Sequence, residues 1–82
     1  MMQAIRTRYL HASNTRPASV AAACDLLRIR VEHDFNLADE INHRRAATRL
    51  CHRLGWRIVA GPGIYRGDHY WLVRDSEARD HD

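Results

Sequence analysis

One segment of the chain, residues 36–56, carries both start and stop signals for a helix, and no other stretch constrains the fold as strongly. It reads NLADEINHRRAATRLCHRLGW. Asn36 is a favoured N-cap residue type, and two acidic residues beginning at Asp39 fall in the first turn, where carboxylates suit the helix dipole. Gly55 follows the last apolar residue, at a position where a left-handed glycine often ends a helix. We therefore predict a helix over residues 37–54.

The segments on both sides of this helix alternate in the manner of half-buried strands. In residues 3–10, Ile5 and Thr7 share one face while Arg6 and Arg8 share the other. After the helix, further strands are predicted in WRIVAG and HYWLVR, and the glycine-rich GPGIYRGD between them is predicted to be a turn region.

Residues 18–33 allow two interpretations. The alanine-rich first half could form a helix, with Pro17 near its first turn. The second half instead alternates apolar with charged side chains, namely Leu27, Arg28, Ile29, Arg30, Val31 and Glu32. We favour two strands, 19–24 and 27–33, although alanine is a poor strand former.

The resulting order is β-β-β-α-β-β, an α+β fold with one amphipathic helix on a mostly antiparallel sheet. With 82 residues, the chain is expected to form a single domain over 1–74, followed by an acidic, disordered tail over 75–82. A core this small favours a shallow site over a deep cleft. The sequence contains neither an apolar run of membrane-spanning length nor the apolar core of a signal peptide, so the bacterial cytoplasm is the expected location.

The charge is distributed unevenly. All 13 basic residues are arginine, whose planar guanidinium binds phosphates and carboxylates in a bidentate manner. The tail over 75–82 holds four acidic residues against one arginine, a net charge of −3, which leaves +6 for residues 1–74. A basic body predicts an anionic partner, for which the tail could compete. The alternative is a soluble body with a frayed terminus.

Plotted at 100° per residue, the predicted helix has one apolar and one basic side. The apolar sector holds Leu37, Ile41, Ala47, Leu50, Cys51 and Leu54. On the opposite side lie Arg45, Arg49 and Arg53, which could follow a phosphate backbone. The outward Arg6, Arg8, Arg28 and Arg30 of the predicted strands would extend this patch. The alternative for each arginine is a solvated surface.

Aromatic residues near the end of the chain provide a further feature of nucleic-acid recognition. Tyr65 and Tyr70 could stack on bases, as aromatic side chains do for single strands. Trp56 and Trp71 could do the same, but in a small core they are expected to be packing anchors.

The spacing within the helix does not favour a metal site, and no cofactor is predicted. Cys51 and His52 are adjacent and point about 100° apart, while His43 lies about 12 Å from Cys51 along the axis. We expect His43 to be a structural hydrogen-bonding residue. We also expect Cys24 and Cys51 to be reduced and buried.

The sequence contains no motif that would mark a catalytic nucleophile, so we predict a non-enzymatic protein without catalytic residues. The remaining acid–base candidates are three histidines and two aspartates that folding could bring together. They are His33, Asp34, His43, Asp68 and His69. The GPGIYRG segment lacks the Gly-Lys-Ser/Thr ending of a phosphate-binding loop.

Two blocks of sequence, AIRTRYL-A-NTR over 4–16 and H--N--E-NHR-AA--LC--LGW over 33–56, support a resemblance to a known group. With them the chain resembles short proteins encoded by phages, plasmids and other mobile elements of proteobacteria. The resemblance covers about half of the chain and departs at PASVAAAC, where the group has a Gly-Ser-x-Ile-Lys-like strand. It implies the β-β-β-α-β fold and an accessory or anti-defence role, and it implies no catalytic residue.

Three hypotheses for the function follow. The leading one is a binding protein of a mobile element that docks a nucleic acid or a host protein–nucleic acid complex, for example as an anti-CRISPR-like inhibitor. The second is a small nuclease or hydrolase that uses His33, His43 or His69. The third is a homodimeric interaction module that pairs through an exposed edge of its sheet.

Overall fold

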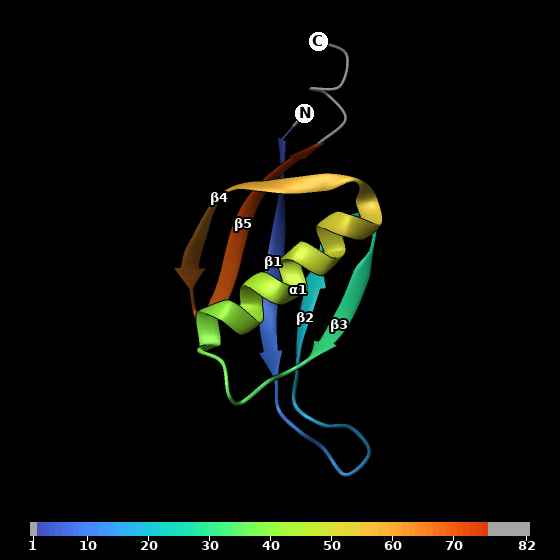
Figure 1. Ribbon diagram of the computed structural model, residues 1–82, viewed down its shortest axis with the longest axis vertical. Coiled ribbons are helices and arrows are strands. Elements are labelled where there is room, and N and C mark those ends of the chain that lie inside the picture. The colour runs from blue at the N-terminus through green and yellow to red at the C-terminus, as the bar shows by residue number, and fades with distance from the viewer. Residues whose placement is uncertain (1, 76–82) are drawn as a thin grey trace.

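The computed structural model describes residues 2–75 and has the β-β-β-α-β-β order, which confirms the predicted α+β fold. Its elements are β1 (Met2–Leu10), β2 (Ser19–Ala23), β3 (Arg28–Glu32), α1 (Asp39–Leu54), β4 (Trp56–Tyr65) and β5 (Asp68–Asp75). The sheet order is β3-β2-β1-β5-β4, and every neighbouring pair is antiparallel. The helix crosses one face of the sheet diagonally (Figure 1), and no other helix or strand of residues 2–75 covers the opposite face.

The alternation predicted for β1 is confirmed. Ile5 and Thr7 are fully buried on the side of the sheet that α1 covers, whereas Arg6 and Arg8 are exposed on the other side. The apolar core lies between the sheet and the helix. It consists of Ile5, Val20, Ala22, Val31, Ala46, Ala47, Leu50, Cys51, Trp71 and Val73.

The ambiguous region forms the hairpin of β2 and β3. Its alanine-rich strand lies between two other strands and beneath the helix, where Ala22 is fully buried. On the helix, Ala46 and Ala47 are also fully buried. Short side chains on both layers allow the helix to approach the sheet closely, and this packing outweighs the low intrinsic strand propensity of alanine.

The start of the helix differs from the prediction. The helix begins at Asp39 and not at residue 37, and its N-cap position is Ala38, which has no side-chain cap. Asn36 is not an N-cap, because its backbone N–H donates to the Asp34 carboxylate at 2.9 Å. The Leu37 N–H donates to the Asp34 carbonyl at 3.1 Å, so a tight turn occupies the place of the predicted first helical turn.

The side chain of Asn42 joins this turn to the helix. Its Nδ2 donates to the Asp34 carbonyl at 2.9 Å and also lies 3.2 Å from the Ala38 carbonyl, while its Oδ1 accepts the Asp34 N–H at 2.8 Å. Asn42 is therefore buried with its polar atoms satisfied. At the other end, Gly55 has a φ of 72° and donates its N–H to the Cys51 carbonyl, which confirms the predicted stop.

The predicted apolar side of the helix is confirmed at the centre of the helix, but the prediction is wrong at the start of the helix. Leu37 precedes the helix, and Ile41 is 47% exposed. The inward positions of the first turns belong instead to Asn42 and His43, both of which are buried. The later beginning of the helix and these two polar residues explain why the apolar sector does not extend to Ile41.

The glycine-rich segment predicted as a turn region is mostly strand. β4 continues through it to Tyr65, and its pairing with β5 shifts register around residues 58–63. Only Arg66 and Gly67 form the turn, with φ angles of 52° and 83°, as expected for a two-residue hairpin connection. Gly61 and Gly63 therefore accompany irregular pairing within a strand, which a local turn signal does not distinguish from a loop.

The remaining predictions about the chain concern its end, its cysteines and membrane segments. Asp75 ends β5, and residues 76–82 of the predicted acidic tail lie outside the described residues. Cys24 and Cys51 are both free thiols, the second buried and the first half-buried. Among residues 2–75, no helix combines the length and the apolar content that a membrane crossing requires.

Candidate functional site

The face of the sheet that points away from α1, here called the open face, carries arginines in two adjacent rows. In the first row, Ala23 of β2 lies between Arg6 of β1 and Arg28 of β3. In the second row, Ala21 lies between Arg8 and Arg30. These six residues are called the arginine trough. Its arginines stand on strands two positions apart, so their backbones are about 10 Å apart across a floor of alanine.

Two hollows of the open face adjoin at this trough. One has a volume of about 120 Å³ and is lined by Arg6, Arg8, Leu10, Ala21, Ala23 and Arg28. The other has a volume of about 300 Å³ and is lined by Ala4, Arg6, Ala23, Cys24, Asp25 and Tyr70. They share Arg6 and Ala23, so the trough continues toward the aromatic ring of Tyr70.

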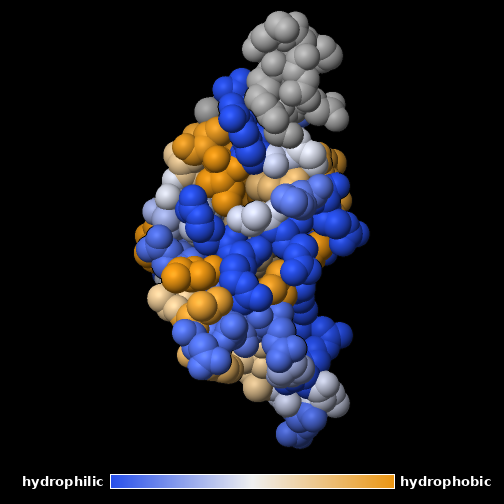
Figure 2. Space-filling model, in the orientation of Figure 1, coloured by the Kyte–Doolittle hydropathy of each residue, from blue (hydrophilic) through white to orange (hydrophobic). Residues whose placement is uncertain are grey.

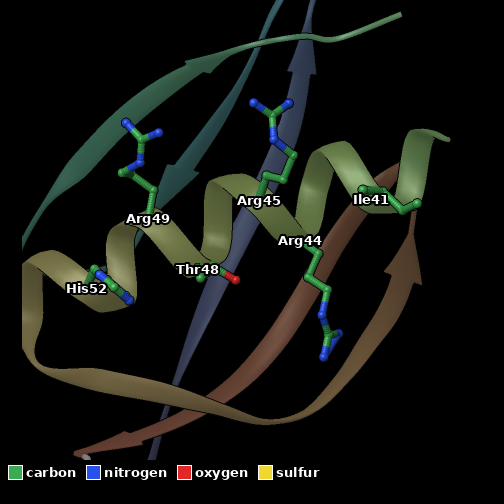
Figure 3. Close-up of a pocket in the computed structure, with 6 residues that line it drawn as sticks. All are labelled: Ile41, Arg44, Arg45, Thr48, Arg49 and His52. Carbon is green, nitrogen blue, oxygen red and sulfur yellow. The ribbon is translucent and has the colours of Figure 1, made fainter. Parts of the chain in front are cut away.

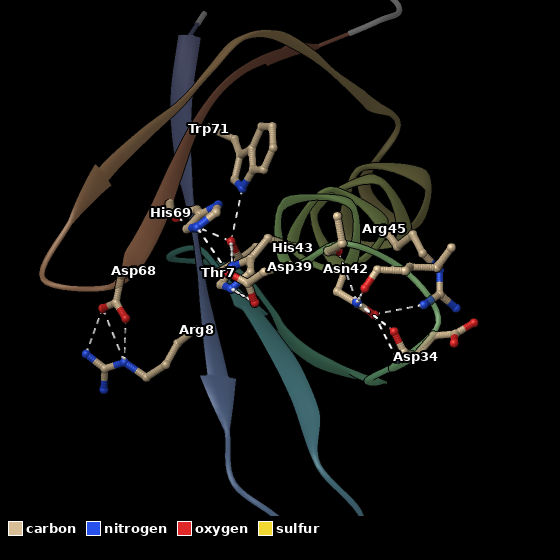
Figure 4. Close-up of polar contacts among 12 residues, drawn as sticks. Thr7, Arg8, Asp34, Asp39, Asn42, His43, Arg45, Asp68, His69 and Trp71 are labelled. Carbon is tan, nitrogen blue, oxygen red and sulfur yellow. Dashed lines mark hydrogen bonds and ion pairs between the residues drawn. The ribbon is translucent and has the colours of Figure 1, made fainter.

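One carboxylate, Asp68, lies beside the trough and orients part of it. Arg8 donates to it through Nη2 at 2.8 Å and through Nε at 3.1 Å, as Figure 4 shows, and Arg6 Nε lies 4.0 Å away. The hydrogen bond from Arg8 holds the pKa of the Asp68 carboxyl below its usual range. Arg28 and Arg30 have no ion pair or side-chain hydrogen bond within residues 2–75. Positive charge therefore exceeds negative charge in the trough.

An aromatic side chain stands beside the trough. Tyr70 of β5 lies opposite Arg6 on one side and opposite Gly63 of β4 on the other. Its side chain is at the open face and the residue is 36% exposed. Because Gly63 has no side chain, nothing from that position covers the ring. The row therefore reads arginine, alanine, arginine, tyrosine, glycine across all five strands.

The helix arginines predicted for the same anionic partner lie on the other side of the molecule. The outer surface of α1 has a hollow of about 360 Å³, lined by Ile41, Arg44, Arg45, Thr48, Arg49 and His52. In Figure 3, Arg45 and Arg49 extend to one side of the helix and Arg44 extends to the other. Figure 2, which views the molecule from the helix side, shows hydrophilic side chains across the middle of this face.

The single patch predicted from the sequence is therefore corrected to two separate surfaces, because the sheet lies between the helix and the open face. Some helix arginines also have partners. Arg45 donates to the Asn42 side chain at 3.2 Å, and the Arg44 guanidinium lies 5.5 Å from the centre of the Trp71 ring. Arg49 and Arg53 have no such partner within the described residues.

Beneath the helix, folding brings together two histidines that are 26 positions apart in the sequence. The rings of His43 and His69 are stacked, with centroids 3.8 Å apart and planes 13° apart. They are only 1% and 4% exposed, and the exposed carboxylate of Asp39 lies at the edge of the pair. His33 is not part of this cluster; its ring packs against Tyr9 and Phe35.

The hydroxyl of Thr7 is the centre of this buried network (Figure 4). It accepts a hydrogen bond from Trp71 Nε1 at 3.0 Å, lies 2.8 Å from His43 Nδ1, and donates to the His69 carbonyl at 3.4 Å. Because a hydroxyl has one proton, all three contacts are satisfied together only when His43 carries its proton on Nδ1. Burial, followed by the nearby His69, lowers the pKa of His43.

Sequence reasoning identified His43 as a hydrogen-bonding residue and Trp71 as a packing anchor, and both predictions are confirmed. It missed the contact between His43 and His69, because helix spacing carries no information about a strand that follows much later. Comparisons of this chain with known protein families, with curated proteins and with solved structures find no match.

Proposed function

We propose that the protein binds single-stranded nucleic acid on the open face of its sheet. The observation that carries the proposal is the arginine trough, in which the arginines of β1 and β3 flank the alanines of β2. Of its four guanidinium groups, those of Arg6 and Arg8 share the Asp68 carboxylate, and those of Arg28 and Arg30 form no ion pair within residues 2–75. Positive charges gathered on one face repel one another unless an anion lies between them, so a polyanion is the partner that suits this surface.

The trough suits the phosphate part of such a ligand. Arg28 and Arg30 form no ion pair within residues 2–75, and Arg8 is held in position by Asp68. Arginine binds phosphate through two parallel N–H groups. The short alanine side chains between the arginines of β1 and β3 leave room for the sugar–phosphate backbone of the ligand. A phosphate group would be placed in the hollow of about 120 Å³ that Arg6, Arg8 and Arg28 line.

The neighbouring strands suit the bases. Tyr70 lines the second hollow together with Arg6, so a base attached to a phosphate in the trough would reach the tyrosine ring. Stacking on an aromatic side chain contributes about 1–3 kcal/mol per base and tolerates any sequence. A single strand is favoured over a duplex, because the major groove admits a helix or a two-stranded ribbon and not the face of a five-stranded sheet.

The helix surface is the weaker candidate for the same ligand. Of its four central arginines, Arg44 contacts Trp71 and Arg45 contacts Asn42. The exposed surface there offers Arg49 and Arg53 without partners within residues 2–75, but neither tyrosine nor tryptophan lines its hollow. It therefore provides a matched comparison in which the same number of partner-free arginines can be removed from each face.

The experiment measures fluorescence anisotropy of labelled DNA and RNA single strands of about 12 nucleotides, a length within the usual range of such sites. Replacing both Arg28 and Arg30 with alanine is expected to weaken binding at least about tenfold. It should also reduce the slope of log affinity against log salt by about 1.4, because each phosphate contact contributes about 0.7. The control variant, with Arg49→Ala and Arg53→Ala, is expected to bind within about twofold of the native chain.

Two results would contradict the proposal. If the helix control loses more affinity than the trough variant, the ligand lies on the helix. If neither DNA nor RNA binds at low salt, direct nucleic-acid binding is excluded. A host protein–nucleic acid complex, the partner that also fits a mobile-element protein, would then be sought through its protein component.

A further inference from the structure

We propose that Asp39, His43 and His69 form a binding site for a divalent transition-metal ion such as Zn²⁺, with solvent completing its coordination. Their candidate ligand atoms all lie within 4.8 Å of one another. Asp39 is the first residue of α1, His43 lies one turn later, and His69 is in β5. The site is separate from the arginine trough, and it does not depend on nucleic-acid binding.

The distances favour an ion over direct hydrogen bonds. His43 Nε2 lies 3.7 Å from one Asp39 carboxylate oxygen, and His69 Nε2 lies 3.8 Å from the other. Both distances exceed the range of a hydrogen bond, which ends near about 3.2 Å for nitrogen and oxygen. Two ligands of a tetrahedral zinc ion, each about 2.1 Å from it, are about 3.4 Å apart. The two histidine–carboxylate distances therefore exceed this separation by only a few tenths of an ångström, and all three ligand atoms lie within 4.8 Å of one another.

The hydrogen-bond network prepares His43 as a ligand. With the Nδ1 proton donated to the Thr7 hydroxyl, Nε2 carries the free lone pair and points toward Asp39. Metal-binding histidines usually donate their other ring N–H to an oxygen in this way, which fixes the ring.

The ring of His69 is the part of the site that would move when an ion binds. Stacked rings direct their Nε2 lone pairs side by side, so one ring must tilt for both to reach the same ion. His69 is buried, and its Nδ1 has no hydrogen-bond partner, so no such bond opposes this movement. Asp39 is 66% exposed at its side chain, which gives an ion a path from solvent.

Cys51 does not compete for the ion. It is not part of the ligand cluster, which consists of Asp39, His43 and His69. The site thus has the two-histidine, one-carboxylate composition of catalytic zinc and non-haem iron centres, which leaves coordination positions for water. Bound there, the ion would join the first turn of α1 to β5.

The test is calorimetric titration of the chelator-treated full chain with ZnCl₂. We expect one ion per chain and a higher Tm with zinc, because an ion that binds only the folded state stabilises it. Asp39→Asn and His69→Gln should each weaken binding at least about tenfold. Asp39 is exposed, so its variant remains informative even if His69→Gln does not fold. The matched controls are His52→Gln, outside the cluster on the same helix, and Cys24→Ser, and both should bind zinc as the native chain does.

A Co²⁺ titration gives an independent readout. Its visible spectrum should show nitrogen and oxygen ligands without a thiolate band, and the ring protons of His43 and His69 should shift in NMR spectra. The proposal is overturned if neither ion binds, if Asp39→Asn binds zinc with native affinity, or if Cys24→Ser abolishes binding. The variant lacking Arg28 and Arg30 should retain zinc binding, so failure of the nucleic-acid proposal leaves this result unaffected.

Discussion

Polar side chains have different surroundings on the two faces of the sheet, although the same strand, β1, contributes to both faces. On the face covered by α1, β1 places Thr7, whose hydroxyl contacts three other groups. On the open face it places Arg6 and Arg8, which share a single carboxylate. The Thr7 hydroxyl is thus matched by three partners on the covered face, whereas guanidinium groups outnumber their partners on the open face.

This difference suggests that the covered face serves the stability of the fold and the open face serves ligand binding. A buried polar group costs free energy unless it is hydrogen-bonded, so the covered face must satisfy its own donors and acceptors. An exposed arginine is hydrated without help, and it keeps its capacity for an external anion. Substitutions on the covered face should therefore lower stability, and substitutions in the trough should lower affinity for a ligand.

The largest effect is expected for Thr7→Val, which keeps the shape of the side chain and removes its hydroxyl. Trp71 Nε1 and His43 Nδ1 would both lose their partner in a buried environment. Each unsatisfied group costs about 1–3 kcal/mol, so the free energy of unfolding should fall by about 3 kcal/mol. Urea denaturation followed by tryptophan fluorescence measures this change.

The matched control is Thr48→Val on the exposed surface of α1, which should change the free energy of unfolding by less than about 0.5 kcal/mol. If both threonine variants are equally stable, the buried network does not support the fold. The division between the two faces would then have to be abandoned.

Local patterns in the sequence were sufficient for the order of elements and for the faces of β1. Alternation requires only that one side of a strand be buried, and Arg6 and Arg8 follow it. The same patterns misplaced the helix start, since the Asp34 carboxylate accepts the Asn36 N–H and forms a turn. The same residue types, such as asparagine and aspartate, are favoured at helix N-caps and in turns, so tertiary packing decides which of the two forms.

The site depended on information that no local pattern contains. That Arg28 and Arg30 point outward was predictable, but the alanine floor between them and β1 depends on strand order and register. Likewise, His43 meets His69 because β5 returns to the centre of the sheet beside β1. Both arrangements arise from long-range pairing, which residue spacing within a single element does not reveal.

A second, smaller effect is expected on β4, where two glycines differ in their surroundings. A Cβ at Gly61 would lie 2.9 Å from the Tyr70 carbonyl oxygen and 3.2 Å from the Cα of Trp71, and the φ of Gly61 is 122°. Gly61→Ala should therefore lower the free energy of unfolding by about 2 kcal/mol. Thermal and urea denaturation both report the change.

Gly63→Ala is the control, because a Cβ at Gly63 has no neighbour within 4 Å. Its stability should stay the same or rise by up to about 1 kcal/mol, since alanine reduces the freedom of the unfolded chain. Equal losses for both variants would show that β4 tolerates no side chain beside Tyr70, on either face of the sheet.

The smallest effect is a dependence of stability on pH between about 7 and 5, which we expect from His43 on the covered face. His43 has its pKa lowered in the folded chain by burial and by His69, and the nearby Asp39 and Asp68 only partly oppose this. In the unfolded chain the imidazole has its ordinary pKa of about 6.5. Below that pH the unfolded state binds more protons, so the free energy of unfolding should decrease as the pH falls from about 7 to 5.

Urea denaturation across this pH range, with a chelator present, measures the dependence without interference from bound metal. His43→Gln should flatten the curve, whereas the exposed His52→Gln should keep the native slope. A native slope in His43→Gln would assign the pH dependence to other groups and contradict the role of His43.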